Sequence, residues 1–374
     1  MKLLFFTIQI NMFGGLGRIV VDKINWLVDH GYEVYLCNIE RCEVKPAYPI
    51  DSRVKLIRGD ISTVPGNALT RLKGVLGAIR NVKKVIRDVQ PDVIVNAHCP
   101  LVTWILPFVF KRIPKVIECH QSRQGLDVLD SWAMNGFSRW LHRWSIRWIY
   151  SCYDKFVVLT NGDKASWKTK NSIVIPNFSN YSEMSSNNID DIVDKEKQII
   201  AIARLVPQKR IDLLIKVWET LHKDFPDWKV KVLGGGEYGS PYEQNLRKMI
   251  ADGDMENSFL MPGAVPDVTE ELTKSSIMCL TSEYEGFGIV LIEAMLKGVP
   301  VMAFQYIGVD DIIENGVDGY VVPFGDVDAY AEKLRTLMIS AEERERLSTN
   351  ALRSVHKFDK EKVMRRWVEL FESL

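Results

Sequence analysis

Two glutamates stand on either side of a glycine-containing turn, and this group is the chain's strongest candidate for chemistry. Glu285 comes just before the turn, and Glu293 lies inside the apolar helical pattern that follows it. Glycines let the backbone approach a phosphate or a sugar, and a carboxylate among apolar side chains needs a partner such as a ribose diol. An ordinary capped helix would explain either glutamate taken alone. The candidate contacts here are Glu285, Gly286, Phe287, Gly288, Ile289, Val290 and Glu293.

Three cations crowd the corner between an apolar run and a helical pattern that begins near Ile211. Two of them, Arg204 and Lys209, stand where a ligand would lie, because ligands of open α/β sheets bind beyond the carboxyl ends of the strands. Guanidinium and ammonium groups at that edge would neutralise a diphosphate. The alternative is a solvated surface turn, which basic residues also form.

Glycine-rich turns follow two other apolar runs. Gly14, Gly15 and Gly17 open the first helical pattern, where backbone N–H groups and the helix dipole favour an anion. Their spacing is not the dinucleotide-binding fingerprint, and such a turn also serves tight packing of a strand on a helix. Gly235, in the run Gly234–Gly236, would bring backbone to the same sheet edge as the cations. A plain turn explains Gly235 equally well.

These groups need a scaffold of parallel strands, and the apolar pattern predicts one. Short continuous Val, Ile and Leu runs alternate with helical patterns, which is typical of βαβ units in a sheet covered on both faces. We expect strands at 2–8, 33–38, 54–57, 93–96, 115–119, 155–159 and 172–175, and, after a polar stretch at 177–194, at 198–203, 229–233, 258–261, 277–281, 300–303 and 319–322. The sequence thus predicts an α/β protein with two domains built from repeated βαβ units.

Nearly the whole chain resembles glycosyltransferase family 4, specifically in its second half and more weakly in its first. The likeness rests on Arg204, Lys209, the two glutamates spaced around Gly286-Phe287-Gly288, and the later run Asn315–Pro323. It implies a GT-B fold, in which two Rossmann-like domains with parallel sheets face a central cleft and the C-terminal helix crosses back to the first domain. One departure is Gly308–Asp311, which stands where relatives often carry a glycine-rich turn and a Glu.

With this likeness, we expect an acceptor domain over 1–178, a linker over 179–196, a nucleotide-sugar-binding domain over 197–357 and a final helix over 358–374 that packs on the first domain. The resemblance implies that Arg204 and Lys209 bind the donor diphosphate and stabilise the leaving group. It likewise implies that Glu293 holds the ribose and that Glu285 contacts the donor sugar. The Gly15 turn would lie beside the diphosphate from the other domain.

His120 follows an apolar run, at a position where similar enzymes place a histidine on the donor sugar. Histidine at the carboxyl end of a strand is well placed for chemistry, although a core or turn histidine is the plain alternative. We therefore expect the catalytic residues to be Glu285, His120, Arg204 and Lys209.

Members of this family are typically retaining and need no metal. Two aspartate pairs have explanations other than a metal site, since Asp252 and Asp254 close a helical pattern and Asp326 and Asp328 resemble a helix cap. We expect no cofactor beyond the nucleotide-sugar co-substrate, with UDP favoured over GDP as its nucleotide. Catalysis would consist mainly of electrostatic stabilisation of the departing diphosphate.

Composition limits the partners of the chain. Its 374 residues exceed the size of one hydrophobic core, and 48 basic against 48 acidic side chains argue against a nucleic-acid binder. The six cysteines show neither disulfide nor zinc spacing, so we expect a reducing, cytoplasmic location. We expect neither a signal peptide nor a membrane-spanning helix, since the most apolar stretch, 101–110, is too short.

A basic and aromatic helical pattern over 137–150 suggests peripheral membrane contact. Its two stripes consist of Trp140, Trp144 and Trp148, and of Arg139, Arg143 and Arg147. Adjacent basic and aromatic faces suit a bilayer surface. A core helix with inward tryptophans and solvated arginines would satisfy the same pattern.

The resemblance, together with these patterns, implies a retaining glycosyltransferase. It would extend a glycan acceptor, either linked to a polyprenyl diphosphate or at the cell surface, as in capsule or lipopolysaccharide synthesis. One alternative is a sugar-nucleotide epimerase on the same fold, which would need no acceptor. Another is a non-catalytic two-lobed sugar-binding protein, although the presence of Arg204, Lys209, Glu285 and Glu293 counts against it.

Overall fold

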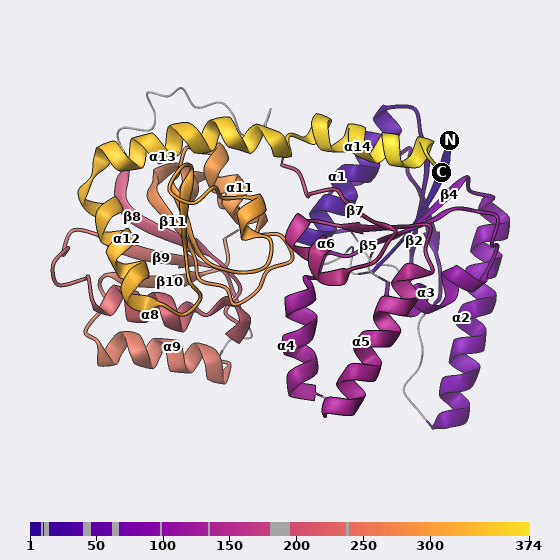
Figure 1. The fold of residues 1–374 in the computed structure, drawn as a ribbon, viewed down its shortest axis with the longest axis horizontal. Coiled ribbons are helices and arrows are strands. Elements are labelled where there is room, and N and C mark those ends of the chain that lie inside the picture. The colour runs from indigo at the N-terminus through magenta and orange to yellow at the C-terminus, as the bar shows by residue number, and fades with distance from the viewer. Residues whose placement is uncertain are drawn as a thin grey trace. The chain divides into compact units, whose positions relative to one another are not determined.

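The structure is a computed structural model that describes residues 1–8, 10, 15–39, 46–61, 67–97, 99–133, 135–179, 195–236, 239–265 and 267–374. The chain divides into two compact units (Figure 1). The N-terminal unit comprises Met1–Asn177 together with Glu361–Leu374, and the C-terminal unit comprises Phe178–Lys360. The linker predicted at 179–196 falls mostly outside the described residues, so the domain boundaries drawn from the sequence stay a prediction.

The described part of the N-terminal unit contains a parallel seven-stranded sheet of order β3-β2-β1-β4-β5-β6-β7. Its strands are β1 (Lys2–Thr7), β2 (Glu33–Asn38), β3 (Lys55–Arg58), β4 (Val93–Ala97), β5 (Lys115–Glu118), β6 (Lys155–Val158) and β7 (Ser172–Val174). Its helices are α1 (Gly15–Asp29), α2 (Ala68–Val89), α3 (Pro100–Ile105), η1 (Leu106–Phe108), α4 (Arg123–Ala133), α5 (Gly136–Ser151), α6 (Asn161–Trp167) and α14 (Lys360–Glu372).

Successive side chains of β1 alternate between the two faces of this sheet. Leu4 and Phe6 pack in a core that also contains Val82 and Ile86 of α2. Figure 1 shows α2 and α3 on that side of the sheet and α1 and α14 on the other. Both faces are therefore covered, which explains why the central strands β1, β4 and β6 are nearly continuous apolar runs rather than alternating ones.

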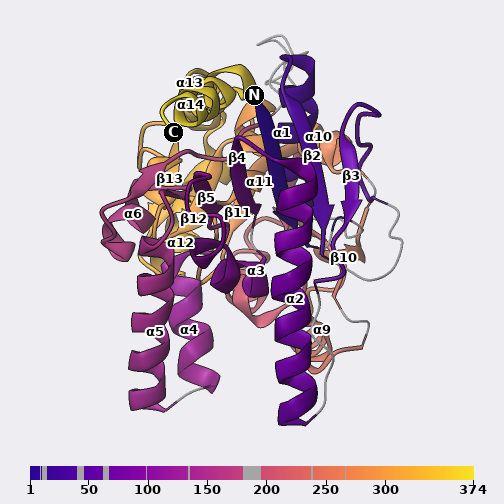
Figure 2. The same cartoon turned by 90° about the vertical axis from the view of Figure 1, so that its right-hand side faces the viewer.

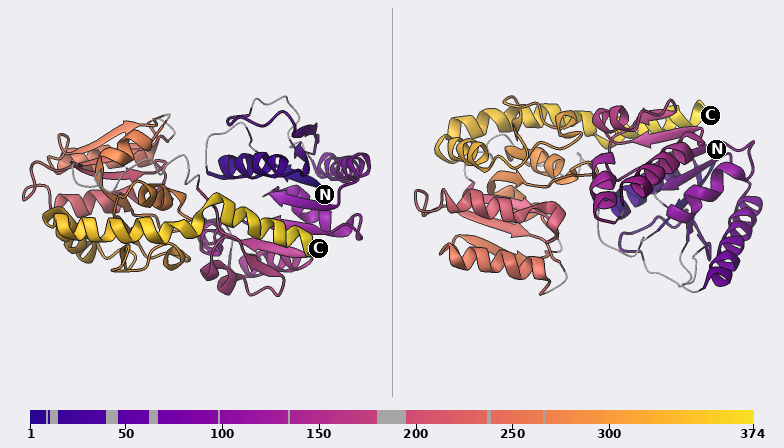
Figure 3. Two further views of the ribbon diagram at one scale, coloured as in Figure 1. Left: turned by 90° about the horizontal axis from the view of Figure 1, so that it is seen from above. Right: turned by 60° about the horizontal axis from the view of Figure 1, so that its bottom comes forward.

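The C-terminal helix α14 belongs to the N-terminal unit (Figure 3). Its buried stripe consists of Val363, Met364, Trp367, Leu370 and Phe371. The indole Nε1 of Trp26 on α1 donates a hydrogen bond of 2.7 Å to Glu361 at the beginning of α14. The expected return of the final helix to the first domain is confirmed.

The described part of the C-terminal unit contains a second parallel sheet, six-stranded and of order β10-β9-β8-β11-β12-β13. Its strands are β8 (Glu196–Ile202), β9 (Lys229–Leu233), β10 (Phe259–Gly263), β11 (Ser275–Leu280), β12 (Val301–Phe304) and β13 (Gly319–Val322). Its helices are η3 (Pro207–Lys209), α8 (Ile211–Glu219), α9 (Pro241–Asp252), α10 (Thr269–Lys274), α11 (Ile289–Leu296), η4 (Val309–Asp311), α12 (Val327–Ile339), α13 (Ala341–Ser354) and η5 (Val355–Phe358).

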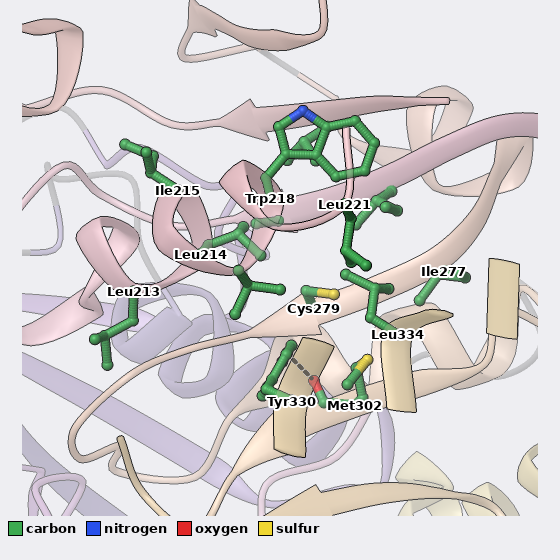
Figure 4. Close-up of a cluster of buried hydrophobic side chains, with 14 of the residues drawn as sticks. Leu213, Leu214, Ile215, Trp218, Leu221, Ile277, Cys279, Met302, Tyr330 and Leu334 are labelled. Atoms are coloured by element: carbon green, nitrogen blue, oxygen red, sulfur yellow. Dashed lines mark hydrogen bonds between the residues drawn. The ribbon is translucent and has the colours of Figure 1, made fainter. Parts of the chain in front are cut away.

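The main core of this unit lies between the sheet and the helices α8, α9 and α12 (Figure 4). Trp218 of α8 and Leu334 of α12 are both fully buried there, and the Tyr330 hydroxyl donates to the Met302 carbonyl oxygen at 3.1 Å. Figure 1 shows α11 on the opposite side of the sheet from α8 and α9. The two parallel sheets with helices on both faces confirm the predicted α/β fold class.

Candidate active site

The candidate site of the C-terminal unit lies where the strand order of its sheet reverses. Strands β8 and β11 are neighbours, but the chain leaves β8 toward β9 on one side and reaches β12 from β11 on the other. Loops that leave adjacent strands at such a switch point diverge and leave room for a ligand. The segments after β8 and after β11 are the ones that carry Arg204, Lys209 and Glu285.

Lys209 and Glu285 meet directly at this edge. The Lys209 Nζ lies 2.6 Å from Glu285 Oε1, which also accepts a hydrogen bond of 2.6 Å from the Ser282 hydroxyl. Glu285 is buried, with only 8% of its surface exposed. Its second oxygen, Oε2, accepts no hydrogen bond from the described residues. One oxygen of the carboxylate is thus fixed by the protein, and the other is available to a ligand.

Backbone contacts hold the two loops together around this ion pair. The Thr281 hydroxyl donates to the Lys209 carbonyl oxygen at 3.0 Å, and the Glu283 amide donates to the Gln208 carbonyl oxygen at 2.9 Å. The Gln208 side chain in turn donates to the Tyr284 carbonyl oxygen at 2.8 Å. The short helix η3 is therefore clamped onto the loop after β11, so Lys209 is delivered to Glu285 in a fixed position.

The two other cations of the corner have different roles. Arg204 is exposed, and within the described part of the chain no carboxylate lies within 4.0 Å of its guanidinium. Arg204 is nevertheless near the site, because its charge partly offsets the burial and the acidic neighbours that raise the pKa of Tyr284. Arg210 instead pairs with Asp212 at 3.0 Å. Arg204 is thus the cation best able to meet an anionic ligand.

The turn before α11 brings backbone N–H groups to the same edge. Gly288 has a φ of +91°, and a Cβ there would lie 2.5 Å from the Tyr306 hydroxyl, so only glycine fits. That hydroxyl donates to the Phe287 carbonyl oxygen at 3.1 Å. No side chain caps the start of α11. A helix that begins without a side-chain cap can offer its first N–H groups to an anion.

Some side chains near this turn pack in the core, and others are partly exposed. Phe287 is buried and packs edge-on against Phe358, so only its backbone can contact a ligand. Ile289, Val290 and Glu293 are half-buried, and Glu293 follows the other two by four and three residues, which places it on their face of α11. That face is the one that can reach a ligand, whereas the rest of the helix is core.

Packing accounts for two of the three glycines after β9. A Cβ on Gly234, whose φ is +148°, would lie 2.0 Å from the Ala203 carbonyl oxygen, and one on Gly236 would lie 2.8 Å from that of Leu205. Gly235 has room for a Cβ, with Ala264 at an ordinary 3.6 Å. Gly235 nevertheless lies beside the loop after β8, since its carbonyl oxygen accepts a hydrogen bond from the Leu205 amide at 3.1 Å.

Two other motifs are accounted for by local structure. Asn315 and Asp318 close the turn before β13, accepting hydrogen bonds from the Val321 amide at 3.0 Å and the Glu314 amide at 2.7 Å. Gly319 touches the backbone of Val301 too closely for any Cβ. Asp326 caps α12 as expected, accepting from the Ala329 amide at 3.0 Å. Among the described residues, no cluster of three His, Cys, Asp or Glu side chains forms a metal site.

In the N-terminal unit, His120 follows β5 and lies against a buried ion pair. Its Nε2 is 3.0 Å from Glu118 Oε2, which is also 2.6 Å from Lys23 Nζ. Burial on its own would raise the pKa of the Glu118 carboxyl, but the charge of Lys23 and the hydrogen bond from His120 outweigh it and hold this pKa at about 2. Gly15 and Gly17 lie in the first turn of α1, and Gly14 falls outside the described residues.

The aromatic stripe of α5 faces outward. Trp140, Trp144 and Trp148 are 60%, 55% and 43% exposed, which shows that the core-helix interpretation is wrong. Arg143 instead turns toward α4, where its guanidinium lies 2.8 Å from Asp127, and Arg147 donates to the Lys168 carbonyl oxygen at 2.7 Å. Helical periodicity predicted the two stripes but could not decide whether the tryptophan stripe is buried.

Sequence reasoning missed several residues of these sites, namely Lys23, Glu118, Gln208, Ser282 and Tyr306. A signal existed for Lys23, which interrupts the apolar stripe of α1, and for Glu118, which ends an apolar strand. Opposite charges on two buried elements indicate a buried ion pair. The other three act through backbone or loop contacts, which leave no such signature.

Two family models account for most of the chain. A model described as Glycosyltransferase Family 4 matches residues 13–181, and one described as Glycosyl transferases group 1 matches residues 185–354. An uncharacterized glycosyltransferase of Haemophilus influenzae is 26% identical over 98% of both chains. The amylovoran biosynthesis glycosyltransferase AmsD of Erwinia amylovora is 26% identical over 99% of both.

A solved structure shows the same fold over the full length. Anabaena Alr3699/HepE, in complex with UDP and glucose, superposes on all of this chain and all of its own with a TM-score of 0.77 at 18% identity. The two matched models together span nearly the whole chain, and three motif residues of the likeness, Arg204, Lys209 and Glu285, follow the carboxyl ends of the neighbouring strands β8 and β11. The chain is therefore a glycosyltransferase of family 4 with the GT-B fold.

Proposed function

We propose that this glycosyltransferase is retaining and metal-independent, and that it transfers a sugar from a UDP-sugar to a lipid-linked or surface glycan. The observation that carries the proposal is the fixed pair of Lys209 and Glu285 beside an exposed arginine and the start of α11. A diphosphate needs positive charge and N–H donors, and a sugar needs a hydrogen-bond acceptor. Both kinds of group are present at one sheet edge.

Each group has a role in the proposed reaction. Glu285 Oε2 accepts a hydrogen bond from a hydroxyl of the donor sugar, while Oε1 keeps its hydrogen bonds from Lys209 and Ser282. Arg204, Lys209 and the first N–H groups of α11 stabilise the charge that develops on the diphosphate as the glycosidic bond breaks. Glu293, on the face of α11 that also presents Ile289 and Val290, accepts hydrogen bonds from the ribose hydroxyls. The acceptor hydroxyl then attacks the anomeric carbon from the face that the diphosphate leaves and passes its proton to the departing phosphate oxygen, so the anomeric configuration is kept.

Two relatives support the nucleotide and the acceptor class. The Anabaena protein was solved with UDP and glucose, which favours a UDP-sugar for this chain as well. The Erwinia relative is named for the biosynthesis of amylovoran, which favours a glycan acceptor. A glycan assembled on a lipid carrier would require the enzyme to work at a membrane. Among the described helices, none is long and apolar enough to cross a bilayer, so we propose surface contact through α5.

Donor choice is tested by thermal unfolding of the purified chain with UDP, GDP and a panel of UDP-sugars and GDP-sugars. A ligand that binds only the folded protein raises the melting temperature with its occupancy. We expect UDP and one or more UDP-sugars to stabilise the chain, and GDP not to. Radiolabel from the stabilising sugar is then followed into lipid-extractable glycan. Turnover of the donor without any acceptor would indicate an epimerase instead.

Site residues are tested with Lys209→Ala and Glu285→Ala. Each should reduce transfer by about tenfold or more, because each removes a group that stabilises the transition state. Lys231→Ala is the matched control, since Lys231 forms a similar pair with Glu271 at 2.7 Å outside the site. Wild-type rates in both site variants would overturn the assignment. The anomeric configuration of the product, read by NMR, tests retention, and undiminished transfer in EDTA tests independence from metal.

A further inference from the structure

Four side chains of the N-terminal unit form a continuous buried row. The indole ring of Trp367 on α14 lies 3.7 Å from Lys23 Nζ on α1, measured to the ring centroid. Lys23 is 2.6 Å from Glu118 Oε2, and the same oxygen is 3.0 Å from His120 Nε2. The side chains of Lys23 and Glu118 are 1% and 2% exposed, and that of His120 is 7% exposed. Three elements far apart in sequence thus converge on one histidine.

The shared oxygen determines which ring nitrogen of His120 carries a proton. An ionised carboxylate has no hydrogen to donate, so the contact at Glu118 Oε2 requires His120 Nε2 to be the donor. Lys23 keeps that carboxylate ionised although it is buried, because it supplies the opposite charge. In the neutral imidazole, Nδ1 is then the acceptor. Nδ1 is buried and has no hydrogen-bond partner among the described residues.

We propose that Lys23 and Glu118 are positioning residues that hold His120 as its Nε2–H tautomer, with Nδ1 kept as the acceptor for a hydroxyl of the sugar substrate. This inference rests on the proposed function. Buried acceptors are normally satisfied, so an unpartnered Nδ1 beside a strand end points to a ligand that completes it. The atoms that cover Nδ1 must move aside for that hydroxyl, so this bond belongs to the ligand-bound state.

The C-terminal helix is part of the same arrangement. Trp367 closes over Lys23 and excludes water from its ammonium, and desolvation lowers the pKa of Lys23 against the effect of Glu118. An ammonium on an indole face is attracted by the ring quadrupole, which partly replaces the lost hydration. Docking of α14 therefore completes the environment that fixes Glu118, and through it the ring of His120.

The first test replaces the ion pair with apolar residues of similar size, in Lys23→Met/Glu118→Leu. Such a replacement often leaves stability unchanged, because no buried charge remains unpaired. We expect kcat to fall about tenfold or more, since a misplaced histidine loses its contact in the transition state. Lys231→Met/Glu271→Leu is the matched control, a Lys–Glu pair in the other unit, and should keep the wild-type kcat.

A double-mutant cycle separates positioning from general support of the fold. If the pair acts only through His120, Lys23→Met/Glu118→Leu should change kcat by less than about twofold in a His120→Ala background. An equal loss in both backgrounds, or no loss in either, would overturn the proposal. Should the double variant not fold, Glu118→Asp keeps the charges balanced but withdraws the carboxylate by one methylene. Glu118→Asp should show the same dependence on His120.

A second readout needs no substrate. Nitrogen-15 spectra of histidine-labelled protein distinguish protonated from unprotonated ring nitrogens, and the His120→Ala variant assigns the signals. We expect His120 to show a protonated Nε2 in the wild type and in the control variant, and to lose that preference in Lys23→Met/Glu118→Leu. A protonated Nδ1 with bare Nε2 in the wild type would contradict the inference. Because this result is independent of turnover, it also distinguishes failure of the inference from failure of the proposed function.

Discussion

At the scale of single residues, the site depends on glycines that serve two different purposes. Gly234 and Gly236 let the turn after β9 lie against the backbone of Ala203 and Leu205, which is the segment that carries Arg204. Gly288 lets the chain enter α11 beneath the Tyr306 hydroxyl. Close backbone approach in the turn after β9 therefore fixes the position of Arg204. Gly288 instead fixes the direction of the backbone N–H groups at the start of α11, which face a ligand.

Gly234 and Gly235 provide a direct test of the first purpose. Gly234→Ala places a methyl group 2.0 Å from the Ala203 carbonyl oxygen and adopts a φ of +148°, so the backbone must shift. We expect Gly234→Ala to lower the free energy of unfolding by about 1–3 kcal/mol. Gly235→Ala, whose Cβ meets only Ala264 at 3.6 Å, should change stability much less. Urea unfolding measures both, and equal midpoints would show that close packing does not explain Gly234.

At the scale of elements, the apolar runs predicted every strand that the structure describes, with bounds that differ by at most two residues. This worked best for central strands such as β4, β11 and β12, which are buried along their whole length, because uniform burial leaves a strong sequence signal. The apolar pattern did not show which residues of different elements would meet. The Lys209–Glu285 pair joins residues 76 apart in sequence, and the Lys23–Glu118 pair joins residues 95 apart. Only the strand order of each sheet brings them together.

The strands also determine the reactivity of the cysteines. Cys37 in β2, Cys119 after β5 and Cys279 in β11 are buried, and burial raises the pKa of each thiol to about 12. Burial likewise raises the pKa of Cys99 well above its ordinary value. Since only the thiolate reacts, these four should resist a disulfide reagent at pH 8 in the folded protein.

The measurement uses a Cys42→Ser/Cys152→Ser background, because Cys152 is exposed and Cys42 lies outside the described residues. We expect four thiols to react only after denaturant is added, when their pKa values return to about 8.5. Rapid reaction of any of them under native conditions would mean that its strand opens readily or is less buried than the structure shows.

At the scale of the whole molecule, exposed apolar and basic side chains concentrate on one side of the N-terminal unit. Figure 2 shows α2 and the α4–α5 pair projecting from this unit in the same direction. The exposed apolar residues on α2, α5 and the α3–η1 segment are Leu69, Leu72, Leu76, Trp104, Phe108, Phe137, Trp140, Leu141, Trp144 and Trp148. The α2 helix carries six Lys or Arg and one acidic residue, and α5 carries three Arg and no acidic residue.

This combination favours an anionic lipid surface as the partner. Aromatic and leucine side chains enter the region between headgroups and acyl chains, while Lys and Arg meet the lipid phosphates. A glycosyltransferase whose acceptor is carried by a lipid would gain from such contact, because the acceptor would be confined to the same surface. The helices would act as a platform that touches the bilayer without crossing it.

Sedimentation with lipid vesicles tests the platform. We expect the chain to bind vesicles containing phosphatidylglycerol more tightly than vesicles of phosphatidylcholine alone, and high salt to weaken that preference by screening the charges. Trp140→Ser/Trp144→Ser/Trp148→Ser should weaken binding by about tenfold or more, because these side chains contribute most of the buried apolar area on α5. Ile339→Ser is the matched control, since Ile339 is 68% exposed on α12 of the other unit. Unchanged binding of the triple variant would mean that the exposed tryptophans serve another partner.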